Sequence, residues 1–244
     1  MENSEHLWWI DSAKGIGVIL IVLGHLLYDS SHDVLNQIIY SFHVPMFFIL
    51  AGFVCRHRKG IAEKVKFLRK KAYRLIIPFI IFTLFGVKRI YDAIGSIPNT
   101  ELIRQIFYID GKMFFNAPLW FLIVLFEICI VEVLIDAYNQ TKILNGLVLL
   151  ASLGSGYVLY QNGGVESLNY LGFNRMIICL FFFVLGISLK KLFNDAVLLK
   201  PISKGFEFSL LILAAVVTYL LAVKINGKVA LYSYVLQNYW IFVM

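Results

Sequence analysis

Charged residues and cysteines are scarce in this sequence. Charged residues make up 15% of the 244 residues and hydrophobic residues 60%, whereas roughly a quarter of the residues are charged in soluble domains. The shortage of charge excludes an ordinary water-soluble domain and indicates a protein whose solvent is lipid. The three cysteines, Cys55, Cys129 and Cys179, lie within apolar runs and lack the spacing of a metal site. We therefore expect buried thiols and no bound metal.

Several common catalytic and nucleotide-binding motifs are also absent. The sequence contains no Gly-Lys-Ser/Thr phosphate loop, no GxSxG elbow, no HExxH motif and no dinucleotide-binding fingerprint. The first apolar run follows Glu2, Glu5 and Asp11 and lacks a small-residue cleavage site. We expect it to be a permanent helix rather than a signal peptide.

Apolar runs dominate the sequence. With their flanking Gly, Ser, Tyr and Trp residues, most of them reach the roughly 20 residues needed to cross a bilayer. The pattern predicts an all-α, polytopic transmembrane helical bundle of seven or eight helices, with residues 1–244 forming a single integral membrane domain. The runs cover residues 16–27, 44–55, 75–87, 119–135, 143–160, 176–189, 208–223 and 229–244.

Basic residues are concentrated in one segment. Residues 56–74, RHRKGIAEKVKFLRKKAYR, contain nine of the 22 lysines and arginines. If this segment is cytoplasmic, helix alternation places 15 Lys and Arg inside and six outside, in agreement with the positive-inside rule. We therefore expect a cytoplasmic N-terminus and a multi-pass protein of the cell membrane.

Two explanations of this basic segment stay open. Topology and attraction to anionic lipid headgroups account for most of the charge, and a polyanionic cytosolic ligand is the alternative. The segment lacks a DNA-binding pattern, so we expect no nucleic-acid partner.

We expect the second helix over 38–56, a third helix that starts at Leu75 with Pro78 in its first turn, and a fourth over 118–136.

Three ionisable residues lie in or beside the first two apolar runs. Lys14 and His25 are eleven residues apart, which is three helical turns plus about 20°, so both project from one helix face about 16 Å apart. His43 opens the second helix across a short turn, and we expect both imidazoles to face one cavity from the outer leaflet. Close helix approach is expected at the glycines of the first helix, Gly15, Gly17 and Gly24.

Ionisable groups at membrane depth predict a functional role, because their insertion costs free energy. Histidine titrates near neutrality and accepts a proton from a hydroxyl, which is the work of a general base. The alternative is that Lys14 snorkels to the headgroups and His25 is a satisfied packing residue. Glu127, eight residues into the fourth helix, is expected to need an internal partner such as His, Lys or Arg, and Arg175 is interpreted as a snorkelling side chain.

The segments that contain the two histidines resemble a known family. WIDSAKGIGVILIVLGH resembles the first-helix signature of the acyltransferase 3 family of membrane acyltransferases, close to its fucose 4-O-acetylase-like members. In that signature a basic residue, here Lys14, precedes a histidine, here His25, by eleven positions. FHVPMFFILAGF resembles the second-helix signature and contains His43, Pro45 and Gly52.

Further segments extend the resemblance over nearly the whole chain. RKKAYRLIIPF resembles the third-helix entry of the family, with two basic residues three apart, Lys71 and Arg74, followed by Pro78. PLWFLIVLFE and FFFVLGISLKK resemble later, looser family segments. The first three matches together are specific.

The resemblance implies an acyl transfer, usually of acetyl from acetyl-CoA, to a hydroxyl of a sugar or another acceptor outside the membrane. It implies that His25 is the catalytic histidine, assisted by His43. It also implies that Lys14, Lys71 and Arg74 bind the acyl-CoA donor near the cytosol, which agrees with the affinity of Lys and Arg for phosphate.

This chain departs from the family pattern in two ways. Family members usually have about ten spans, so the resemblance implies that the C-terminal helices are missing here. Some branches carry an acidic residue where this chain has Leu125, two positions before Glu127. Two alternatives to the enzyme stay open: a small proton-coupled transporter in which His25 and Glu127 relay protons, and an inactive truncated acyltransferase.

Overall fold

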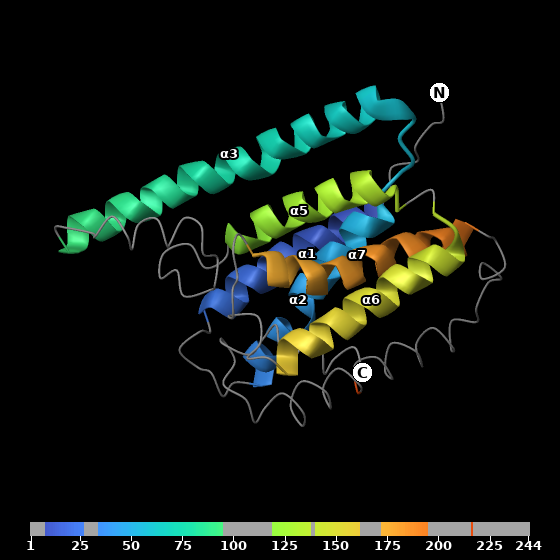
Figure 1. The fold of residues 1–244 in the computed structure, drawn as a ribbon. Helices are drawn as coiled ribbons and strands as arrows, with labels where there is room; N and C mark the ends of the chain where they lie inside the picture. Colours follow the sequence, from blue (N-terminus) through green and yellow to red (C-terminus); the bar gives the residue numbers. More distant parts are fainter. Residues whose placement is uncertain are drawn as a thin grey trace. The chain divides into compact units, whose positions relative to one another are not determined.

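The computed structural model describes residues 8–26, 34–94, 119–137, 140–161, 172–194 and 216. These residues form six helices and no strand (Figure 1), which confirms the prediction of an all-α helical bundle. The runs expected at 208–223 and 229–244 lie outside the described residues, apart from residue 216. The helices are α1 (Trp8–Leu26), α2 (Val34–Phe53), α3 (Gly60–Ile94), α5 (Trp120–Ile135), α6 (Lys142–Gln161) and α7 (Phe173–Asn194).

The chain divides into two compact units. The first contains Met1–Val54 and Leu185–Met244, and the second contains Cys55–Val184. The first unit therefore includes α1, α2 and the last part of α7. The second includes α3, α5, α6 and the first part of α7.

In the first unit, α1 and α2 pack against each other in opposite directions. The ring of Trp9 packs edge-on against Phe53 with the centroids 5.2 Å apart. Eight residues further along α1, a Cβ added to Gly17 would lie 2.5 Å from Cε of Met46 and 2.8 Å from the ring of Phe47. The absence of a side chain at Gly17 allows this contact, which confirms the close approach predicted there.

A second close approach in this unit joins α2 to α7. A Cβ added to Gly186 would collide with the carbonyl oxygen of Ile49 and lie 2.9 Å from the backbone nitrogen of Phe53. Gly24 is buried. Nothing lies within 4 Å of a Cβ added to Gly15, so the prediction of close packing is wrong at that glycine.

In the second unit, α3 and α5 lie side by side in opposite directions (Figure 1). Lys64 of α3 contacts Asp136 at the C-terminal end of α5, and Phe79 packs with Ile123 near the start of α5. Every residue of α5 is apolar except two glutamates. The helix ends at Asp136, whose φ of 49° is left-handed, and this confirms the predicted fourth helix.

The boundaries of α3 differ most from the prediction. The helix begins at Gly60 rather than Leu75, so Pro78 lies in its interior. The segment of residues 60–74 is rich in Lys, Arg, Ala, Glu and Leu, which favour helix, and the backbone N–H of Lys59 donates to Glu63 Oε2 at 2.9 Å. The high charge of residues 60–74 is therefore not evidence that this segment is a loop. The second helix is also displaced, from the expected 38–56 to Val34–Phe53.

One described helix, α1, is long and apolar enough to cross a membrane by length and composition. Shorter apolar helical stretches occupy Phe42–Phe53 and Lys142–Gly156. Helix α1 and these two stretches overlap with three of the predicted apolar runs, residues 16–27, 44–55 and 143–160.

Candidate active site

His43 is buried in α2, with 6% of its surface exposed. Its Nδ1 lies 2.7 Å from the carbonyl oxygen of Ile39, one turn earlier in the same helix. A carbonyl oxygen only accepts hydrogen bonds, so Nδ1 must be the protonated nitrogen. In the neutral ring, Nε2 then carries the lone pair and can accept a proton.

His25 lies at the opposite end of α1 from Trp9 and is exposed. The packing of Trp9 on Phe53 and of Gly17 on Met46 sets the register of α1 on α2. Continued by eight residues, that register brings His25 to the level of Ile39, toward which the ring of His43 points. By this register, the two predicted site residues lie within about one turn of the same level of α1 and α2.

Lys14 lies on the same helix as His25, eleven residues earlier. Its Nζ forms an ion pair with Oδ1 of Asp11 at 3.7 Å, and 40% of its side chain is exposed. The pair is one helical turn long and open to solvent, so it leaves the ammonium available to a second anion.

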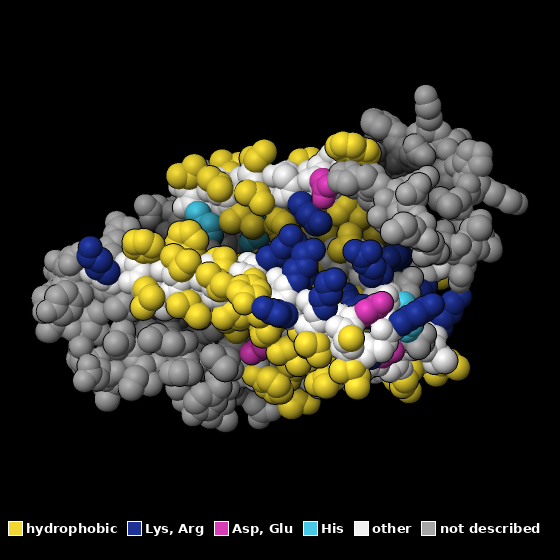
Figure 2. Space-filling view, turned by 90° about the horizontal axis from the view of Figure 1, so that it is seen from above, with side chains coloured by type: hydrophobic (Ala, Val, Ile, Leu, Met, Phe, Trp, Pro, Cys, Tyr) yellow, Lys and Arg dark blue, Asp and Glu magenta, His cyan; other side chains and the backbone are white. Residues whose placement is uncertain are grey.

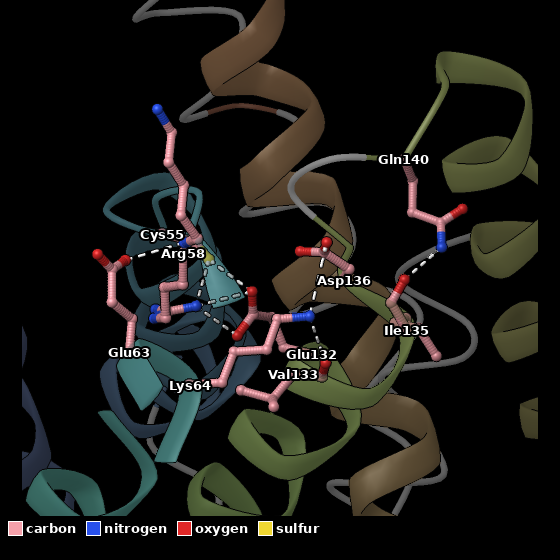
Figure 3. A network of polar contacts seen from close by, with 10 residues as sticks. Cys55, Arg58, Glu63, Lys64, Glu132, Val133, Ile135, Asp136 and Gln140 are labelled. Atoms are coloured by element: carbon pink, nitrogen blue, oxygen red, sulfur yellow. Dashed lines mark hydrogen bonds and ion pairs between the residues drawn. The ribbon is translucent and has the colours of Figure 1, made fainter. Parts of the chain in front are cut away.

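In the second unit, a buried ion pair joins the loop before α3 to α5 (Figure 3). Nη1 of Arg58 donates to both carboxylate oxygens of Glu132, at 2.7 and 2.9 Å, and the Cys55 thiol donates to Oε1 at 3.3 Å. The side chain of Glu132 is 2% exposed. One turn further along α5, Asp136 pairs with Lys64 at 3.6 Å, and Lys64 also donates to the Val133 carbonyl.

The aromatic ring of Phe67 connects this pair to Lys71. The guanidinium of Arg58 lies 3.5 Å from the centre of the ring, and Nζ of Lys71 lies 5.6 Å from the same centre. Both distances are within the range of cation–π attraction. Glu132 fixes Arg58, and Arg58 in turn packs on the ring that Lys71 contacts.

Acidic partners are distributed unequally among the basic residues of α3. Glu132 neutralises Arg58, and Asp136 neutralises Lys64. Within the described part of the chain, neither Lys71 nor Arg74 forms an ion pair. Lys71 lies on the same helix face as Lys64, two turns further on, and Arg74 is exposed. These two predicted site residues are thus available to an anionic ligand.

Arg175 and Glu127 depart from their sequence interpretations. Arg175 is 6% exposed, and its guanidinium lies 4.9 Å from the centre of the Trp120 ring. The interpretation of Arg175 as a snorkelling side chain is therefore wrong. Among the described residues, Oε2 of Glu127 is buried without a hydrogen-bond partner, and the ion pair expected for Glu127 is formed instead by Glu132.

The predicted site residues fall into two sets, each described within its own unit. His25, His43 and Lys14 belong to the first unit, and Lys71 and Arg74 to the second. Sequence reasoning missed Glu132 and its contacts with Arg58. An acidic residue in an apolar run predicts a basic partner, so the position of Glu132 in α5 was the signal that could have found it. The described residues contain no group of three His, Cys, Asp or Glu side chains that could hold a metal.

A family model described as an acyltransferase domain matches residues 7–244. No curated protein and no solved structure matched the chain. The family match covers the helix with Lys14 and His25, the helix with His43, and the α3–α5 pair with Lys71 and Arg74. Members of this family are typically membrane-bound, in agreement with the apolar length of α1. The chain therefore belongs to the acyltransferase 3 family.

Proposed function

We propose that this protein is a multi-pass O-acyltransferase of the cell membrane. Its reaction transfers an acyl group, acetyl in the simplest case, from cytosolic acyl-CoA to a hydroxyl of a sugar or a cell-surface glycan. The observation that carries the proposal is that His25 lies at the level of Ile39, to whose carbonyl the buried His43 is hydrogen-bonded, in a chain that belongs to an acyltransferase family.

The acceptor side of the reaction depends on the two histidines. His25 removes the proton from the acceptor hydroxyl, whose oxygen attacks the thioester carbonyl carbon. The tetrahedral intermediate collapses, the carbon–sulfur bond breaks, and His25 returns the proton to the departing CoA thiolate. The hydrogen bond from His43 Nδ1 to Ile39 keeps Nε2 of His43 as the acceptor nitrogen. His43 can therefore orient His25 or share its proton.

The donor side depends on fixed positive charge. CoA carries phosphates, which Lys and Arg bind strongly. Lys71 and Arg74 suit this role, because they have no acidic partner among the described residues. Glu132 pairs with Arg58 instead, and Asp136 pairs with Lys64. Lys14 is a third donor-binding candidate on α1.

Glu127 favours a second candidate function. Its Oε2 is buried without a hydrogen-bond partner in the described residues, and carboxylates within apolar helices relay protons in some transporters. In that case the protein would move a solute with protons and would not consume acyl-CoA. An inactive truncated acyltransferase would neither transfer acyl groups nor couple transport to protons.

The proposal is tested by incubating membranes that contain the protein with radiolabelled acetyl-CoA and following label into the glycan fraction. We expect His25→Ala to insert normally and to lose transfer by at least about 100-fold, since a general base contributes about 10²–10⁴-fold. His57→Ala, which removes a histidine from the loop before α3, is the matched control and should retain transfer. Label transfer by His25→Ala at the wild-type rate would refute the role of His25.

The role of Lys71 in binding the acyl donor is tested with the same membrane preparation. Lys71→Ala should weaken acetyl-CoA binding, because it removes a cation that no acidic residue of the described chain neutralises. Lys59→Ala, an exposed change in the loop, should leave binding unchanged. Equal acetyl-CoA affinity in wild type and Lys71→Ala would exclude Lys71 from the donor site. Absence of label transfer by the wild type, together with proton-coupled uptake, would favour the transporter.

A further inference from the structure

The first half of α3 exposes a second set of basic residues, on the side away from α5. Lys66, Arg69 and Lys70 are all exposed, and their spacing of three and four residues places them on one helix face. Lys64 and Lys71 lie about 200° around the helix from Lys66 and Arg69, respectively, at about 100° per residue. We call Lys66, Arg69 and Lys70 the outer basic face.

The outer basic face is not neutralised by the described residues of the chain. Lys64, on the side of α3 that faces α5, forms an ion pair with Asp136. Arg58, just before the helix begins, forms an ion pair with Glu132. Within the described ranges none of the three outer cations forms an ion pair, and the guanidinium of Arg69 lies 5.7 Å from the centre of the Tyr73 ring. These three cations have no acidic partner among the described residues, so they are available to an anion from outside the chain.

The same side of α3 continues into an exposed apolar surface. Tyr73, Ile77, Ile80, Ile81 and Leu84 are all exposed large side chains. Figure 2, in which α3 faces the viewer, shows Lys and Arg gathered over one half of this helix and hydrophobic side chains over the other. An exposed apolar surface of this kind is stable when lipid covers it.

The length of the apolar surface fits a bilayer. Lys88 is exposed and follows Lys70 by 18 residues, which is five helical turns, so the two ammonium groups lie on one side of α3 about 27 Å apart along its axis. The hydrocarbon core of a bilayer is about 30 Å thick. The outer basic face therefore begins where hydrocarbon gives way to headgroups, and Tyr73 occupies the interfacial position that aromatic residues favour.

We propose that Lys66, Arg69 and Lys70 bind the phosphate headgroups of anionic phospholipids in the cytosolic leaflet. Charge complementarity and the adjoining lipid-facing surface favour a lipid over a soluble polyanion, because a lipid occupies both surfaces with one molecule. The acyl chains lie along Ile77, Ile80 and Ile81, and the headgroup phosphate meets the cations one to two turns away. This binding is separate from the donor site proposed at Lys71.

The test measures the binding of phosphatidylglycerol and phosphatidylcholine to the purified full chain by native mass spectrometry. Each basic residue near an anionic surface contributes about fivefold in affinity. We expect the triple variant Lys66→Gln, Arg69→Gln, Lys70→Gln to lose at least about tenfold in phosphatidylglycerol affinity, with phosphatidylcholine binding unchanged. The control triple Arg56→Gln, Lys59→Gln, Lys142→Gln removes the same number of exposed charges away from the apolar surface of α3 and should lose several-fold less phosphatidylglycerol affinity than the outer triple variant.

Two further measurements keep the outcome decisive. The charge-preserving pair Lys66→Arg, Lys70→Arg should retain phosphatidylglycerol binding, and its failure to do so would contradict a headgroup role. Acetyl-CoA affinity should be unchanged in the outer triple variant. Loss of acetyl-CoA binding with phosphatidylglycerol binding intact would overturn the proposal and assign the outer basic face to the soluble donor. Equal phosphatidylglycerol loss in both triple variants would overturn it as well, because net charge alone would then explain the effect.

Discussion

Two glutamates five residues apart on α5 have different surroundings. Glu132 receives both hydrogen bonds from Arg58 and a third from the Cys55 thiol. Oε2 of Glu127 is buried and has no hydrogen-bond partner among the described residues. Five residues correspond to about 500° of helix rotation, so the two carboxylates point to different sides of α5. Of the two, Glu132 faces Arg58 in the loop before α3.

Glu132→Gln should destabilise the protein by about 3–5 kcal/mol, because it leaves the guanidinium of Arg58 without its buried counter-charge. The measurement is the free energy of unfolding in detergent. Asp136→Asn is the matched control, since Asn tolerates the left-handed backbone at this position. The Lys64–Asp136 pair is partly exposed (25% and 31%), so its loss should cost less than about 1 kcal/mol. Equal stability of Glu132→Gln and Asp136→Asn would contradict the structural role assigned to Glu132.

The helices approach most closely where one of them lacks a side chain. At Gly186 of α7, an added Cβ would meet the backbone of α2, which cannot rotate away as a side chain can. At Gly17 of α1, an added Cβ would meet the flexible ends of Met46 and Phe47. The contact at Gly186 is therefore the more demanding of the two.

We expect Gly186→Ala to destabilise the protein by about 1–3 kcal/mol through overpacking. Gly154→Ala in α6, where nothing lies within 4 Å of an added Cβ, should be neutral or stabilising by up to about 1 kcal/mol. Thermal unfolding of the two variants in the same detergent measures the difference. A lower melting temperature in Gly154→Ala than in Gly186→Ala would show that backbone contact does not govern this position.

Over the whole chain, charge is distributed as the positive-inside rule requires of a membrane protein. The basic cluster starts in the loop before α3 and continues along the first half of that helix. The loop between α1 and α2 contains no Lys or Arg. From this asymmetry we predict that the connection between α1 and α2 lies outside the cell and that the start of α3 lies in the cytosol.

The orientation is tested with a membrane-impermeant maleimide. In intact cells Ser31→Cys should label, whereas Ala62→Cys should label only after the membrane is opened. The native cysteines are free and buried, so wild type serves as the background control. Labelling of Ala62→Cys in intact cells would reverse the orientation and would remove the cytosolic donor route from the proposed reaction.

The sequence predicted the helical class and most of the described helices, because apolar runs of bilayer length are local features. It also predicted that Gly17 allows close packing. It failed at α3, where the charged residues 60–74 looked like a loop, since high charge and high helix propensity coexist in Lys- and Arg-rich segments. The start of α3 at Gly60 could be predicted only by weighing the helix propensity of these residues against their high charge.

The candidate site was predicted in part. Lys14 and His25 could be placed on one helix because periodicity relates residues eleven apart. The relation of His25 to His43 required the register of α1 on α2, which Gly17 and Phe53 set. Arg58 and Glu132 are 74 residues apart, and a sequence does not say which of nine nearby cations a buried acid selects.

The sequence by itself determined where most of the described helices lie, which connecting segments carry positive charge and which family motifs are present. These properties depend on local composition and on the fixed geometry of a helix. Only the tertiary structure decided that His43 is buried while His25 is exposed, that Glu132 rather than Glu127 has the ion pair, and that Lys71 has no acidic partner among the described residues. Such choices depend on which helix faces meet, because a charge in an apolar interior is stable only where packing brings its counter-charge within hydrogen-bonding distance.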